Sequence, residues 1–161
     1  MIRSPRKIHK YLSLAISVQL LLWTISGIYF SFNKIEDVRG SQYLKPKEAI
    51  ETSKGIKIEA QQALILVAEK TYLTPQSVTE ITENESGSEY RGRSLPLYKI
   101  EAIYEKNKEI SVYVDPFSKE IVAVRSNQWR IWDFMWGIHI MDWDESCLLY
   151  TSDAADEVDR G

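Results

Sequence analysis

The longest apolar run in the chain extends from Tyr11 to Phe32 and contains 22 residues without a charged side chain. As a helix rising about 1.5 Å per residue, it would be about 33 Å long and would cross a hydrocarbon core of about 30 Å. Aromatic residues gather at its far end, as they do at a membrane interface. A cleaved signal peptide is the alternative, but its apolar region is shorter and ends at a small-residue cleavage site. We therefore predict a retained transmembrane helix over residues 11–32.

Charges on the two sides of this run differ. Four basic residues and no acid lie in residues 1–10, whereas the basic residues that follow Phe32 are mixed with acids. Because positive charge resists translocation, the N-terminal segment is expected in the cytoplasm and everything after Phe32 outside it. This orientation predicts a protein of the bacterial inner membrane, in contact with the lipid bilayer, with an exterior domain.

Two polar features of the apolar run predict companion helices. Six residues, five of them small, are spaced 4-3-4-3-4 and fall on one helical stripe: Ser13, Ser17, Leu20, Thr24, Gly27 and Ser31. Small stripes allow helices to approach closely in lipid, although these residue types are common in membrane helices generally. Gln19 places an amide near mid-membrane, where it needs a partner. Both features imply transmembrane helices that this chain does not contain.

The periodicity changes after a polar connector at residues 33–55. Residues 60–71 place apolar side chains on one stripe of a helix. Four later segments show strand periodicity or composition, at residues 78–82, 98–104, 110–114 and 120–125. Residues 56–126 are thus predicted to form an α+β domain, with one helix on an antiparallel sheet of three or four strands. Its expected core includes Leu64, Val67, Ile100, Val112, Val114 and Ile121.

Residues 127–146 are predicted to form an aromatic helix. A 3-4-3-4 spacing places four indoles and an imidazole on one stripe, which consists of Trp129, Trp132, Trp136, His139 and Trp143. Interspersed charges favour the membrane interface, where Trp keeps its ring in apolar surroundings and its N–H in water. One interpretation is an interfacial anchor that leads into a further membrane helix. The other is a haem site, because a b-type haem needs axial imidazoles and an aromatic, apolar wall.

The composition and charge of the chain reduce the number of functional classes to consider. A net charge of −3 gives no indication of a nucleic-acid partner. The single Cys excludes an internal disulfide and any multi-cysteine metal site. No nucleophile–base pair or Gly-rich phosphate loop is evident, so no catalytic residue is assigned. Arg91 and Arg93 offer positive charge to an anion, although the polar loop around them is expected to be solvated.

The last residues differ in character from the rest. The stretch "CLLYTSDAADE", from Cys147 to Glu157, resembles a transposon-end sequencing adapter translated in one frame. We therefore expect residues 147–161 to be adapter-derived and the native sequence to end at Glu145 or Ser146, within a longer membrane protein. In that case Cys147 has no role in the function of the native protein.

Two motifs of the exterior region resemble the PepSY domain family. They are the helix "AQQALILVAEK" and the hairpin "VYVDPFSKEIVAV". The flanks are similar to the first helix, and to the segment before the next helix, of PepSY-associated transmembrane proteins; they read "RKIHKYLSLAISVQLLLWTISGIYFSF" and "WRIWDFMWGIHIMDWDE". The resemblance covers residues 6–145.

This resemblance implies two classes of function. Larger PepSY-associated membrane proteins include haem-bearing reductases, some acting on ferric siderophores, which would make His9 and His139 candidate axial ligands of haem b, with Trp132 and Trp136 beside them. By the predicted topology the two histidines lie about 30 Å apart, so each needs a second ligand from absent helices. The alternative is a non-enzymatic module, since PepSY domains also restrain thermolysin-type proteases in their propeptides. Such a module would bind an envelope protein or regulate a peptidase.

Overall fold

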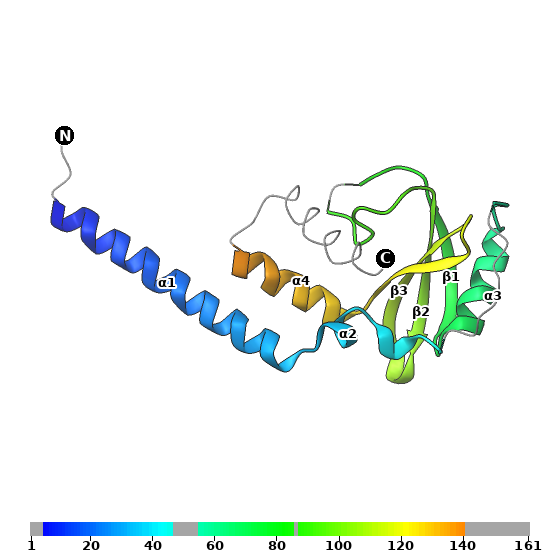
Figure 1. Ribbon diagram of the computed structural model, residues 1–161, viewed down its shortest axis with the longest axis horizontal. Helices are drawn as coiled ribbons and strands as arrows, with labels where there is room; N and C mark the ends of the chain where they lie inside the picture. The colour runs from blue at the N-terminus through cyan, green and yellow to red at the C-terminus, as the bar shows by residue number, and fades with distance from the viewer. Residues whose placement is uncertain (1–4, 47–54, 86, 141–161) are drawn as a thin grey trace, which may run out of the picture.

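The computed structural model describes residues 5–46, 55–85 and 87–140 (Figure 1). It confirms an α+β architecture with an apolar N-terminal helix and a four-stranded antiparallel sheet that carries a helix. Helix α1 (Pro5–Phe32) projects away from the sheet, and helix α4 (Asn127–Ile140) runs back beside its C-terminal end.

Helix α1 is 28 residues long and starts before the predicted apolar run. Among the described residues it is the one helix long and apolar enough to cross a bilayer. Most of its large apolar side chains are exposed, and only Ser26 is buried. Since so large an apolar surface is unfavourable in water, its length and exposure suit a lipid environment.

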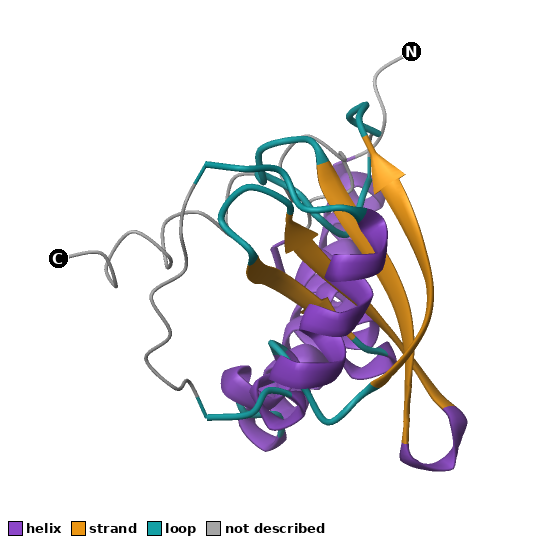
Figure 2. Ribbon diagram, turned by 90° about the vertical axis from the view of Figure 1, so that its right-hand side faces the viewer, coloured by secondary structure: helices purple, strands orange, loops and turns teal. Residues whose placement is uncertain are grey.

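The sheet is a meander in which each strand pairs with the next along the chain. Its strands are β1 (Thr74–Ile81), β2 (Leu97–Tyr104), β3 (Lys108–Asp115) and β4 (Glu120–Arg125). Figure 2 shows the long hairpin of β2 and β3, which the short helix η2 (Glu105–Asn107) closes. Strand β1 begins four residues earlier than predicted, because an edge strand accommodates Pro75 next to a register shift.

Helix α3 (Ala60–Lys70) covers one face of the sheet and encloses the main core. Ile100 pairs with Val112 across β2 and β3, and both are fully buried beneath Val67 of α3. The predicted core residues are all present in this layer, with Leu64 and Ile121 only partly buried at its margin. Strand periodicity identified the face correctly because alternate residues point to opposite sides.

Residues 33–46 are not a simple connector, as the sequence had suggested. They form helix α2 (Ile35–Val38) and the short helix η1 (Ser41–Tyr43). Tyr43 is buried in the main core, and its carbonyl accepts a hydrogen bond of 3.0 Å from the Tyr72 N–H. The segment after α1 is therefore built into the α+β domain.

The loop between β1 and β2 covers the second face of the sheet. Tyr90 of this loop packs with Leu97 and Tyr113 in a second apolar cluster. The expectation of a solvated loop was wrong, because the tyrosine ring is buried and the Arg91 side chain is only 12% exposed. Apolar burial of Tyr90 holds the loop down and brings its arginines over the sheet.

Candidate functional site

His139 lies on the side of α4 that faces α1. Its Nδ1 atom is 2.9 Å from the hydroxyl oxygen of Ser26, which is fully buried. The Ser26 hydroxyl also lies 2.9 Å from the Leu22 carbonyl in its own helix. When the single hydroxyl proton is donated to Leu22, Ser26 Oγ accepts from Nδ1–H, and Nε2 keeps its lone pair. In this tautomer Nε2 is the ring nitrogen available to a metal.

Aromatic rings surround this imidazole. Phe30 of α1 lies at the centre, with ring centroids 5.2 Å from Trp132, 5.8 Å from Trp136 and 5.5 Å from His139. The two indoles stack on each other at 5.4 Å. Three members of the predicted stripe, Trp132, Trp136 and His139, thus contact α1. Trp129 lies against Arg91 and Arg125 instead, and Trp143 lies outside the described residues.

Sequence reasoning missed the α1 side of this contact. It singled out a small-residue stripe, yet most of that stripe is exposed, and Ser17 and Thr24 donate hydrogen bonds to carbonyls of their own helix. The face that meets α4 includes Ser26 and Phe30 instead. Gln19 keeps a buried Nε2 without a hydrogen-bond partner among the described residues, in line with the partner that its position requires.

His9 is placed far from His139. It is exposed on α1, 17 residues before Ser26, which corresponds to about 25 Å along the helix. The two histidines of the chain therefore do not converge on one group. Among the described residues, no cluster of three or more His, Cys, Asp or Glu side chains is suited to hold a metal ion.

Two ion pairs attach α4 to the α+β domain. Arg91 of the loop donates two hydrogen bonds to the Asp133 carboxylate, at 2.7 and 2.8 Å. Arg130 of α4 donates to Glu89 Oε1 at 2.6 Å. Tyr113 of β3 donates to the same carboxylate at 3.3 Å, and burial, followed by the Glu89 charge, raises the pKa of its phenol. The second face of the sheet is thus joined to α4 by charged groups.

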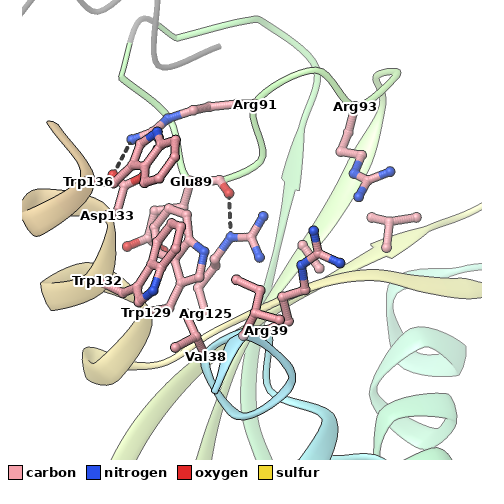
Figure 3. A pocket seen from close by; sticks show the side chains of 13 residues that line it. Val38, Arg39, Glu89, Arg91, Arg93, Arg125, Trp129, Trp132, Asp133 and Trp136 are labelled. Atoms are coloured by element: carbon pink, nitrogen blue, oxygen red, sulfur yellow. Dashed lines mark hydrogen bonds and ion pairs between the residues drawn. The ribbon is translucent and has the colours of Figure 1, made fainter. Parts of the chain in front are cut away.

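A cavity of about 360 Å³ opens beside these ion pairs, between α2, β4, α4 and the loop (Figure 3). Its charged lining residues are Arg39, Glu89, Arg91, Arg93, Arg125 and Asp133. The Arg125 guanidinium lies 4.3 Å from the centroid of the Trp129 indole. Burial, followed by the nearby charge of Arg93, lowers the pKa of Arg125 to about 10.

The haem prediction stays a prediction, and the geometry shows which donor group the described residues offer. His139 supplies one imidazole with an oriented ring and an aromatic wall, which is the donor chemistry of one axial ligand. No second imidazole lies near it among the described residues. Comparisons with protein-family models, curated proteins and solved structures find no match to this chain. The PepSY resemblance therefore stays a prediction that rests on its motifs.

Proposed function

We propose that this chain forms the membrane-anchored, PepSY-like unit of a haem-containing inner-membrane reductase linked to iron or siderophore reduction, with His139 as one axial ligand. The observation that carries the proposal is the hydrogen bond between His139 Nδ1 and Ser26 across α1 and α4. Ligand histidines in metalloproteins commonly donate their second ring N–H to a neighbouring acceptor, which fixes the ring and its tautomer.

The depth of His139 supports this reading. Ser26 lies six residues before the end of α1, about 9 Å along the helix. If Phe32 marks the outer interface, the imidazole lies within the apolar layer, deeper than the interfacial position expected from the charges on α4. A polar ring at that depth is costly unless it has a partner and a role.

Several residues of the chain would support a bound haem. Ser26 orients the imidazole, and Phe30, Trp132 and Trp136 exclude water from it. When bound, haem supplies one-electron exchange, with a potential set by its ligands and the polarity around it. A second protein ligand, if the haem took one, would come from outside the described residues, because His9 is too far along α1.

Haem binding by the full chain in lipid nanodiscs tests the proposal. The wild-type chain, supplied with haem, should show a Soret band, and His139→Ala should reduce it by more than half. His9→Ala is the matched control and should leave the band unchanged. Ser26→Ala should shift the reduction potential while haem remains bound, because it removes the hydrogen bond that orients the ring.

Circular dichroism of each variant separates lost haem from lost folding. Equal Soret bands in wild type and His139→Ala, with both proteins folded, would refute the ligand assignment. A folded wild-type chain that takes up no haem would favour the non-enzymatic alternative, in which the exterior domain binds an envelope protein.

A further inference from the structure

The cavity beside α4 has an excess of positive charge. Four arginines line it against two carboxylates. Both carboxylates already have partners in the described residues, since Asp133 binds Arg91 and Glu89 binds Arg130. Neither Arg39 nor Arg125 forms an ion pair with these two carboxylates.

Arg125 is the most constrained of these cations. Its Nε donates 2.8 Å to the Glu89 carbonyl, and one terminal nitrogen donates 3.3 Å to the Val124 carbonyl. Both acceptors are neutral backbone groups. Its face lies against the Trp129 indole. These hydrogen bonds position the buried guanidinium without an ion pair, and the nearby Glu89 charge compensates only part of the cost of burying it.

Arg39 and Arg91 add donors to the same space. Arg39 follows α2 and is exposed, and no described residue binds its side chain. Arg91 has a buried Nε without a hydrogen-bond partner among the described residues. Figure 3 shows the guanidinium groups of Arg39, Arg93 and Arg125 turned toward the space between them. Guanidinium forks of this kind match the oxygens of a phosphate group.

The cavity also lies close to the outer end of α1. Helix α2, which contributes Val38 to the lining, begins three residues after Phe32. Trp132 and Trp136 line the cavity and also contact Phe30 of α1. If α1 spans a bilayer, the arginines lie at the level of the lipid headgroups, where Trp and Arg side chains are favoured.

We propose that this cavity binds a phosphate group, supplied by an anionic lipid headgroup or by a soluble phosphate compound, with Arg39 and Arg125 as its principal cationic contacts. Trp129 holds the Arg125 guanidinium in place. Arg91, Asp133 and Glu89 line the cavity. The pairs Arg91–Asp133 and Arg130–Glu89 fix α4 against the sheet. The site is independent of His139, which is not among the residues that line the cavity.

The first arm of the test uses lipid. The full chain is reconstituted in vesicles of phosphatidylcholine with a minor fraction of phosphatidylglycerol, and native mass spectrometry measures which lipid stays bound. Wild type should retain phosphatidylglycerol in preference to phosphatidylcholine. Arg39→Gln should lower that preference about tenfold, the size expected for one charge-assisted contact.

The second arm uses inorganic phosphate. The chain in pure phosphatidylcholine nanodiscs is titrated with phosphate at constant ionic strength, and the change in intrinsic tryptophan fluorescence, to which Trp129 contributes, measures binding. Saturable binding that Arg39→Gln weakens about tenfold, without a lipid preference in the first arm, would assign the site to a soluble phosphate compound. A lipid preference without phosphate binding would assign it to the headgroup.

Lys34→Gln is the matched control for both arms. Lys34 is exposed, lies at the same level beyond α1 and does not line the cavity. It therefore measures the general attraction between a basic residue and an anionic surface. Equal losses in Arg39→Gln and Lys34→Gln, or no preference and no phosphate binding in folded wild type, would overturn the proposal. Haem absorbance of Arg39→Gln should equal that of wild type, so the two proposals fail separately.

Discussion

The ion pair between Arg91 and Asp133 should contribute strongly to the stability of the α+β domain. Arg91→Met keeps much of the side-chain stem and removes the guanidinium. Two charge-assisted hydrogen bonds are lost, and Asp133 stays as a carboxylate whose side chain is 19% exposed. Removing one partner of a buried pair costs about 3–5 kcal/mol. Because some solvent reaches this pair, we expect about 2–4 kcal/mol.

The experiment is urea unfolding of the full chain in nanodiscs, followed by near-ultraviolet circular dichroism. Lys57→Met provides the matched control, since Lys57 pairs with Glu80 at the exposed edge of the domain and its loss should be small. Asp133→Leu combined with Arg91→Met should recover much of the loss, because the unpaired carboxylate is then also gone.

The reasoning fails if Arg91→Met and Lys57→Met lower the midpoint equally. It also fails if the double variant is as unstable as the sum of its single changes. Either result would mean that solvent already screens the Arg91–Asp133 pair, and that the other contacts of α4 hold it in place.

Two further predictions concern a turn and a buried phenol. Gly40→Ala should destabilise the domain by about 1–3 kcal/mol, because Gly40 has φ +85° and a Cβ there would lie 2.8 Å from Val124 Cγ1; Gly55→Ala, with φ +127° and nothing within 4 Å, is the control in the same denaturation assay, and an equal loss would show that the close approach has no cost. Tyr113 should make stability fall above about pH 10, since its pKa is raised in the folded state and the unfolded chain then releases the proton first. Tyr113→Phe should flatten that dependence between about pH 9 and about 11, and parallel curves for the two proteins would contradict the shift.

Sequence periodicity predicted the sheet and its core face but not the partners that cover each surface. Alternation at residues 98–104 and 110–114 reports which side chains share a face, and Ile100 and Val112 are indeed buried together. The same signal carries no information about the loop on the other face. Tyr90 reaches its cluster through contacts that depend on how the loop folds back.

In the candidate site, too, the sequence predicted which residues share a face but not which residues they contact. The spacing of Trp132, Trp136 and His139 predicted one stripe, and the structure gathers these side chains on one side of α4. Spacing within one helix does not identify the residues opposite, so Ser26 and Phe30 were missed. Arg91 and Asp133 are 42 positions apart, and their pairing depends on the placement of both the loop and α4. A pattern within one segment does not predict contacts between residues so far apart in the sequence.

The junction between β4 and α4 has a mechanical consequence. Only Ser126 separates Arg125, the last residue of β4, from Asn127, the first of α4, and its side chain is buried. Its hydroxyl caps the helix by accepting from the Trp129 N–H at 3.3 Å. Helix α2, which is built into the domain, makes a second short connection. The sheet is therefore joined to α1 through α2 and to α4 through Ser126. A displacement of the sheet would therefore rotate α4. The resulting movement would be largest near the far end of α4, where His139 contacts Ser26.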